Sequence, residues 1–162
     1  MGHEWKQTHV PSLSLHPIDE EALIRKTELL EQGHYDDPMF DLSREFAEAE
    51  EILIAAPHWD LSFPSILKLY LEHIYAIGIV SRYDEAGKPI GLCKAKTLYY
   101  VTTSGGPYDP RYSYDYLRTL ALDYFGIGET RLFYAENLDI VEGDAVKRLE
   151  EALEKFPFNI KE

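Results

Sequence analysis

Two segments of the chain combine residue types that could bind a ligand. The first, Pro57–Phe63, carries His58 and Trp59 between two prolines. The second, Thr103–Tyr108, contains two consecutive glycines, whose amides can approach a ligand closely. Aromatic side chains beside accessible amides suit a flat ring with polar edges better than a free phosphate. A structural interpretation, in which both segments are tight turns whose aromatic rings pack locally, fits the composition equally well.

An apolar run precedes each of these segments and places it in the fold. Glu51–Ala56 is short and continuous, which is typical of a strand covered on both faces of a parallel sheet. Thr97–Thr102 is rich in residues that favour strands. Ligands of open α/β sheets bind outside the carboxyl ends of the strands, so we expect both segments at one such edge.

The remaining elements alternate between strands and helices. The weaker strand candidates are Trp5–Val10, a hairpin within Ile79–Leu92, and Arg131–Ala135. We expect five helices. The first runs from an Asp19 cap to Gly33, the second opens at Asp37-Pro38, and the third runs from Pro64 to Gly78. The fourth is Tyr114–Phe125, ended by Gly126, and the fifth is opened by Gly143-Asp144 and has Val146, Leu149 and Leu153 on one face. This alternation predicts a doubly wound parallel α/β sheet with right-handed crossovers and helices on both faces. The wide apolar surface of 64–78 indicates burial on two sides, as against a partner subunit.

Composition limits the classes of protein to consider. The chain has 162 residues, 16 basic and 29 acidic, and a formal charge of −13, so we expect a single domain, 1–162. That charge repels phosphate backbones and anionic lipid, which argues against nucleic-acid and membrane-surface partners. We see no apolar run long enough to span a membrane and no secretory signal. A single cysteine, Cys93, excludes a disulfide framework and fits a reducing cytoplasm.

Other familiar chemistries find little support. Gly126-Ile127-Gly128 has Arg131 where a dinucleotide fingerprint needs its third glycine. There is no phosphate-binding P-loop and no nucleophile elbow. The histidines show no zinc-site spacing with Cys93, so we expect no metal site. Cys93 itself precedes a buried strand and is interpreted as a small core residue.

The residues of both segments resemble those of a known family. Ala55–Lys68, with Ala-Pro, an aromatic loop and a Leu-Lys pair, is similar to the strand-loop-helix of the FMN-dependent NADH azoreductases and related NAD(P)H quinone reductases. Thr102–Gly106 resembles the second flavin loop of that family. Matches in Gly78–Tyr83, Gly91-Leu92 and Tyr134–Glu136 extend the resemblance over nearly the whole chain.

The resemblance implies a flavodoxin-like fold, a homodimer with FMN near the subunit interface, and two-electron reduction of quinones, azo compounds or nitroaromatics by NADH or NADPH. The residues it places around the flavin are Pro57, His58, Trp59, Asp60 and Leu61 on one side and Thr103, Ser104, Gly105 and Gly106 on the other. Trp59 and Tyr108 would line the substrate pocket. No side chain is assigned a catalytic role, because the flavin carries the hydride chemistry.

Two departures from the family pattern stand out. Asp60 occupies a position where Asn is frequent, and an ionised Asp can only accept hydrogen bonds. The family also opens with a strand, a Ser-containing loop that holds the FMN phosphate, and a helix, whereas this chain starts at the next strand, near Trp5. We therefore expect the first βα unit to be missing and two sheet edges to be exposed.

Two further interpretations remain open at this point. One is a non-catalytic relative that keeps the dimer surface without FMN. The other is a flavin-independent module that binds a small molecule on the same sheet. The loops on the ring side favour the reductase, and the absent phosphate loop favours the non-catalytic relative.

Overall fold

The structure is a computed structural model that describes residues 5–140 and 144–157. Its strands are β1 (Glu51–Ala55), β2 (Ser81–Tyr83), β3 (Pro89–Gly91), β4 (Thr97–Thr103) and β5 (Glu129–Ala135). Its α-helices are α1 (Glu20–Glu31), α2 (Asp41–Glu48), α3 (Ser65–Ile74), α4 (Tyr114–Thr119) and α5 (Ala145–Glu154). Short 3₁₀ turns span Val10–Ser12, Pro38–Phe40 and Pro110–Tyr112, and a π-helical stretch, Leu120–Phe125, continues α4.

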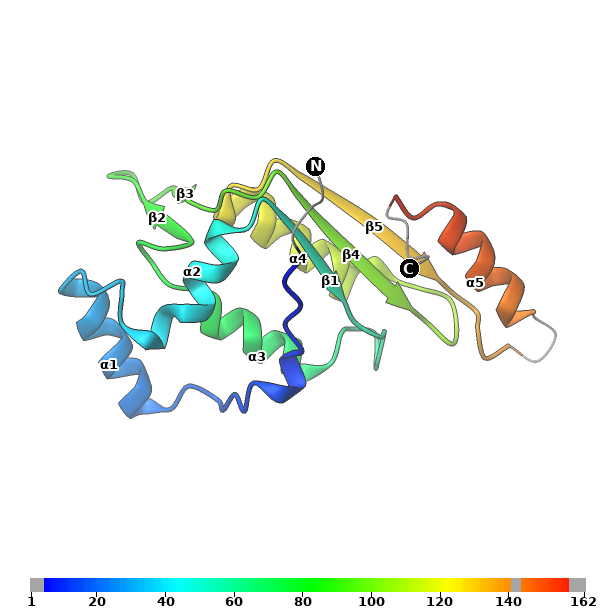
Figure 1. Cartoon of the computed structure of the whole chain (residues 1–162), viewed down its shortest axis with the longest axis horizontal. Helices are drawn as coiled ribbons and strands as arrows, with labels where there is room; N and C mark the ends of the chain where they lie inside the picture. The colour runs from blue at the N-terminus through cyan, green and yellow to red at the C-terminus, as the bar shows by residue number, and fades with distance from the viewer. Residues whose placement is uncertain (1–4, 141–143, 158–162) are drawn as a thin grey trace.

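A three-stranded parallel sheet in the order β1-β4-β5 lies at the centre (Figure 1). Ile54 is paired with Tyr100, and Tyr100 with Leu132, so these side chains point to the same face. That face carries the main core, to which α2, α3 and α4 contribute Phe46, Leu71 and Leu117 respectively. The opposite face is covered at β5, where Phe133 packs against Phe156 just beyond α5. The parallel sheet with helices on both faces confirms the predicted fold class.

Strand β1 is covered on one face only, which corrects the prediction of two-sided burial. Ile54 lies in the core, but Leu53 on the opposite face is 37% exposed. In the described part of the chain, β1 also pairs with β4 alone, so its outer edge is open. The continuous apolar run therefore predicted the strand correctly but not how many of its faces are covered. Burial of a face depends on elements far away in the sequence, which a local pattern does not reveal.

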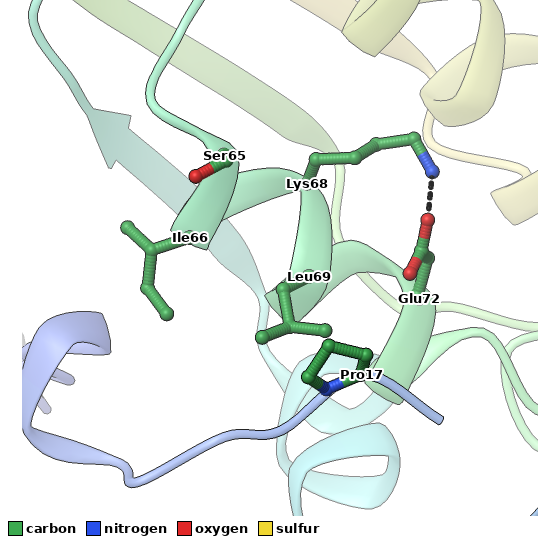
Figure 2. A pocket seen from close by; sticks show the side chains of 6 residues that line it. All are labelled: Pro17, Ser65, Ile66, Lys68, Leu69 and Glu72. Carbon is green, nitrogen blue, oxygen red and sulfur yellow. Dashed lines mark hydrogen bonds and ion pairs between the residues drawn. The ribbon is translucent and has the colours of Figure 1, made fainter. Parts of the chain in front are cut away.

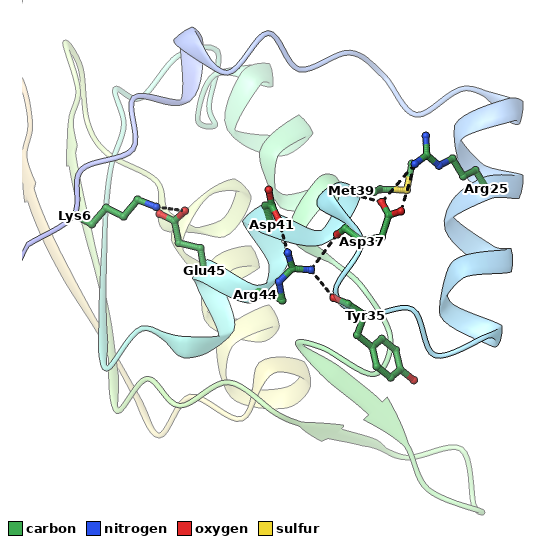
Figure 3. A network of polar contacts seen from close by, with 8 residues as sticks. All are labelled: Lys6, Arg25, Tyr35, Asp37, Met39, Asp41, Arg44 and Glu45. Carbon is green, nitrogen blue, oxygen red and sulfur yellow. Dashed lines mark hydrogen bonds and ion pairs between the residues drawn. The ribbon is translucent and has the colours of Figure 1, made fainter.

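The segment Trp5–Val10 forms no strand, contrary to the sequence-based prediction. Lys6 instead binds the Glu45 carboxylate of α2 at 2.6 Å (Figure 3). Thr8 donates to the same carboxylate at 3.1 Å, and a 3₁₀ turn then begins at Val10. A strand is stabilised by a neighbouring ladder, and no described strand pairs with this segment. We expected an exposed edge on β1 and a second on a strand at Trp5–Val10. Because that segment forms no strand, only the edge of β1 remains of these two.

Arg44 organises the connection between α1 and α2. Its guanidinium donates to the carbonyls of Tyr35 and Asp37 and to the Asp41 carboxylate (Figure 3). Asp37 caps the 3₁₀ turn through the Met39 amide, and α2 follows, so the expected helix at Asp37-Pro38 begins as 3₁₀. Helix α1 has its predicted Asp19 cap.

Helix α3 is shorter than predicted. It ends at Ile74, because Tyr75 is extended and Ile77 forms a bridge with Ser81. The apolar residues after Ile74 thus belong to the excursion that leads to the β2–β3 hairpin, which the sequence predicted. At the base of this hairpin, Gly91 approaches the backbone so closely that a Cβ there would lie 2.0 Å from the Gly126 amide nitrogen.

The last two helices follow the predicted capping residues. Gly126 ends the π-helical stretch in the left-handed conformation. Asp144 caps α5 by accepting a hydrogen bond from the Lys147 amide at 3.1 Å, whereas Gly143 lies outside the described residues. The predicted apolar face of α5 remains largely exposed at Val146 and Leu153.

Candidate functional site

Three loops meet at the carboxyl edge of the sheet: a first loop (Ala56–Pro64) after β1, a second loop (Ser104–Ser113) after β4, and a third loop (Glu136–Ile140) after β5. Backbone hydrogen bonds join them. The His58 amide donates to the Thr103 carbonyl at 3.0 Å, and the Asn137 amide to the Gly106 carbonyl at 3.0 Å. The two segments singled out from the sequence are therefore neighbours, as predicted.

The tip of the first loop is a tight hairpin with an unusual backbone. Trp59 and Ser62 exchange two backbone hydrogen bonds, of 2.7 and 2.9 Å. Asp60 and Leu61 between them have φ values of +48° and +70°. A left-handed backbone costs a residue with a Cβ roughly 1–2 kcal/mol, and for leucine it is uncommon. Trp59 and Leu61, at this tip, are 62% and 60% exposed.

The His58 side chain turns inward. Its ring packs edge-on against the Tyr108 ring, with centroids 4.9 Å apart, and Tyr108 continues to Tyr134 at 5.0 Å. Both ring nitrogens of His58 are buried, and neither has a hydrogen-bond partner in the described structure. The resemblance placed His58 at the ligand, whereas in the structure its ring nitrogens are buried and its amide is bonded to the Thr103 carbonyl, beside the exposed Pro57.

The second loop offers free hydrogen-bond donors. Among the described residues, nothing accepts a bond from the amides of Gly105 and Gly106, and the same holds for Asp60 and Leu61 in the first loop. Space differs between the two glycines. A Cβ on Gly105 would lie 2.1 Å from Asp139 Oδ2, whereas a Cβ on Gly106 would meet nothing within 4 Å.

Hydroxyl groups gather beneath the second loop. The hydroxyl of Tyr108 hydrogen-bonds Ser113 Oγ at 2.9 Å. The hydroxyls of Tyr100 and Thr102 are buried and find no partner within hydrogen-bond geometry in the described structure. Burial raises the pKa of Tyr100 to about 12, against the opposing effect of the nearby Thr102 and Ser113 hydroxyls. Ser104 is also buried, while Thr103 is exposed, so the predicted Thr-Ser pair points to both sides of the loop.

Charges at this edge are mainly negative. The three loops carry four carboxylates, Asp60, Asp109, Glu136 and Asp139, and one cation, Arg111. Glu136 is held in place because its Oε2 accepts a hydrogen bond from the Tyr108 amide at 2.7 Å. Hydrogen bonds from Arg111 lower the pKa of Asp109 to about 2, so this carboxylate is ionised at any physiological pH.

Sequence reasoning missed the contribution of the third loop and of the end of the second. The Glu136 carboxylate accepts a hydrogen bond from the Tyr108 amide, and the Asp139 amide donates to the Gly105 carbonyl at 3.0 Å, so the third loop supports the second. Ser62 Oγ donates to the Tyr112 carbonyl at 2.6 Å and so ties the strained hairpin to the second loop. The topology could have revealed the third loop, because in a parallel sheet every strand, β5 included, ends at this same edge.

Two hollows on the described surface lie outside these loops, and one of them adjoins the end of the first loop at Ser65. A groove of about 310 Å³ runs between Pro17 and α3 and is lined by Ser65, Ile66, Lys68, Leu69 and Glu72 (Figure 2). Lys68 and Glu72 pair with each other along it (Figure 2). A second hollow lies against α1 at Asp19 and Ile24. Both are open to solvent, and neither combines free backbone amides with aromatic rings as the three loops do, so the carboxyl edge remains the candidate site.

Two other sequence expectations concern chemistry outside this edge. Within residues 5–140 and 144–157, no three His, Cys, Asp or Glu side chains come together as metal ligands would. Burial raises the pKa of the Cys93 thiol to about 12, which makes it a poor nucleophile.

None of the described helices is long and apolar enough to cross a membrane.

Comparison of the sequence with known families gives a match over nearly the full chain. The family described as having a flavodoxin-like fold matches residues 2–157. An FMN-dependent NADH:quinone oxidoreductase of Clostridium beijerinckii is 40% identical over 121 residues, covering 73% of this chain and 60% of that protein. A second such enzyme, from Clostridium acetobutylicum, is 37% identical over 152 residues, covering 90% of this chain and 74% of that protein. The chain thus spans about 60% of the length of the first of these relatives.

Solved structures give the same fold. An azoreductase from Bacillus anthracis str. Sterne superimposes with a TM-score of 0.76 at 19% identity, covering 90% of this chain and 76% of that one. An FMN-dependent NADH-azoreductase from Bacillus anthracis str. Ames Ancestor, in complex with FMN, gives a TM-score of 0.75 at 22% identity, covering 92% and 76%.

Proposed function

Because the chain belongs to the flavodoxin-like family that includes the FMN-dependent NADH:quinone oxidoreductases, we propose that it binds FMN and reduces quinones or azo compounds with NADH or NADPH. The observation that carries this proposal is the set of free amides at the tip of the first loop and at Gly105-Gly106. They stand at the carboxyl edge of a parallel sheet, where α/β proteins bind their ligands.

The residues present fit a flavin ring. Its polar edge needs donors for two carbonyl oxygens, and the amides of Gly105 and Gly106 are unengaged in the described structure. The empty space above Gly106 admits a flat ring, and Trp59 and Leu61 provide apolar surface at the hairpin tip. The cofactor residues we propose are therefore Pro57 to Leu61 and Thr103 to Gly106. Trp59 and Tyr108 remain the proposed substrate pocket.

The chemistry divides between cofactor and protein. FMN held by these loops would supply the two-electron hydride chemistry between the nicotinamide and the acceptor. The protein orients the ring through the amides of the second loop and excludes water with Trp59 and Leu61. His58 and Tyr108 support the first loop from beneath, since their rings are in edge-on contact. Asp60 can accept a hydrogen bond from a ring N–H but cannot donate to a carbonyl.

Flavin binding and reduction test the proposal directly. The protein is purified with added FMN, and the folded species is examined for flavin absorbance. Anaerobic NADH should bleach that absorbance, and a quinone should restore it. A colourless, folded protein would refute the proposal and favour a flavin-less relative. Flavin that stays oxidised with both NADH and NADPH would refute the reductase activity alone.

We further propose a homodimer that works in the cytoplasm on small-molecule acceptors. Exposed apolar side chains on α1, Leu23 and Ile24, and on the open face of β1, Leu53, support an additional protein contact. The single cysteine supports a reducing compartment. Light scattering coupled to gel filtration should give twice the mass of the chain, and a monomer at micromolar concentration would contradict the dimer.

A further inference from the structure

Arg111 has an unusual arrangement within the second loop. Its Nε donates to both Asp109 oxygens, at 3.0 and 2.9 Å, and its Nη2 to Oδ2 at 2.6 Å. A guanidinium has five N–H donors, so this side-on pair uses only the Nε–Nη2 edge. No described residue accepts a bond from Nη1. The Nη1–Nη2 fork is thus held in place and free to bind an anion from its open end.

The neighbours of Arg111 fix where this fork lies. The guanidinium carbon stands 5.4 Å from the centre of the Tyr112 ring, which is 54% exposed. The Tyr112 carbonyl accepts the hydrogen bond from Ser62, so the pair of residues lies against the hairpin that carries Trp59. The guanidinium therefore lies over the half-exposed Tyr112 ring at the rim of the candidate site, and its Nη1 end is open.

The electrostatic setting makes this cation selective. In a chain of charge −13, the described loops of the site hold four carboxylates, and Arg111 is their sole cation. An uncharged quinone needs no cation in order to approach. A nicotinamide dinucleotide carries two phosphate charges, and a repulsive edge would slow its binding unless a cation receives them.

We propose that Arg111 binds the pyrophosphate of the nicotinamide dinucleotide, with Tyr112 offering to the adenine the part of its ring that the guanidinium leaves open. This inference rests on the proposed function. The FMN phosphate has the same chemistry, but FMN has no second ring system to use the exposed face of Tyr112. Arg111 thereby determines the affinity for the electron donor, and leaves the affinity for FMN and the acceptor unchanged.

The test uses ADP-ribose, which carries the pyrophosphate and adenine without the nicotinamide. Its binding is measured by calorimetry at about 0.05 M salt, where electrostatic contacts are weakly screened, on FMN-free and FMN-loaded protein. Arg111→Gln should weaken ADP-ribose binding about 10-fold, and Asp109→Asn, which removes the competing carboxylate, should tighten it. Arg131→Gln is the matched control, because Arg131 pairs with Glu129 in the same i, i+2 arrangement away from the loops. It should leave the affinity unchanged.

The possible results separate this inference from the proposed function. Equal ADP-ribose affinity for wild type and Arg111→Gln, or no binding to wild type in either state, overturns the role of Arg111. A loss of FMN affinity in Arg111→Gln, with ADP-ribose binding intact, overturns it also and assigns the anion to the FMN phosphate. If the wild type binds no FMN, the proposed function fails, and the comparison on FMN-free protein still decides the role of Arg111.

Discussion

Replacing Gly106 with alanine separates the stability of the protein from its proposed flavin binding. The added Cβ would meet no atom within 4 Å, and Gly106 does not have the positive φ that would strain alanine. Such a Gly→Ala change stabilises a protein by about 0.4–1 kcal/mol, because it reduces the freedom of the unfolded chain. For a chain of this size, about 1 kcal/mol raises Tm by roughly 2–4 °C. We therefore expect Tm to rise by up to a few degrees.

Flavin binding should change in the opposite direction. A ring lying against the second loop fills the space that the new methyl group takes, and overpacking of this kind costs about 1–3 kcal/mol. Because 1.4 kcal/mol is a tenfold change, the Kd for FMN should rise roughly 5- to 150-fold. Fluorescence titration of FMN measures this, with differential scanning calorimetry for Tm. Gly128→Ala is the control, since its Cβ would only touch the Lys96 carbonyl at 3.4 Å, at the start of β5. Unchanged FMN affinity in Gly106→Ala would refute the placement of the ring.

Three further outcomes are expected. Asp60→Asn should preserve or tighten FMN binding in the same titration, because the neutral amide can also donate and asparagine tolerates the left-handed backbone at φ +48°; a large loss of affinity would contradict this. Gly91→Ala should cost about 3 kcal/mol in urea unfolding, because its Cβ would collide with backbone atoms of Phe125 and Gly126 that cannot move aside; unaltered stability would refute the close packing of the hairpin. Burial raises the pKa of Tyr70, Tyr75 and Tyr100 to about 12, whereas unfolded tyrosine titrates near 10. Stability should therefore be full below about pH 10 and fall as pH rises towards 12, and absorbance at 295 nm showing every tyrosine ionised near pH 10 in folded protein would contradict the burial.

Local signals in the sequence predicted the elements and their ends well. The caps at Asp19, Asp144 and Gly126 are where expected, because capping depends on residues a few positions apart. The two ligand segments were located because apolar runs end immediately before them. The helix α3 was predicted too long, since a continuous apolar pattern does not distinguish a helix from the bridge that Ile77 makes with Ser81.

Features that depend on a distant partner could not be predicted. The segment Trp5–Val10 has a strand-like pattern, but a pattern supplies no neighbouring ladder. The His58 ring packs edge-on against the Tyr108 ring, and Tyr108 lies 50 residues further along the chain. The hydrogen bond from the Asp139 amide to the Gly105 carbonyl crosses from one strand end to the next. Such contacts arise from the topology of the sheet rather than from local composition.

The parallel register of the sheet also has a consequence for how the chain folds. Residue 51 pairs with residue 97, and residue 97 with residue 129, so each ladder closes a loop of more than thirty residues before its first hydrogen bond forms. The entropy of closing such loops must be overcome before the strands gain anything from pairing, which slows folding relative to proteins rich in local contacts. Helices such as α1 and α5 can form early, whereas β1, paired on one edge only, depends entirely on β4. Its unpaired backbone N–H and C=O groups are therefore exposed to other chains for the whole of a slow assembly, and refolding yield should fall as protein concentration rises.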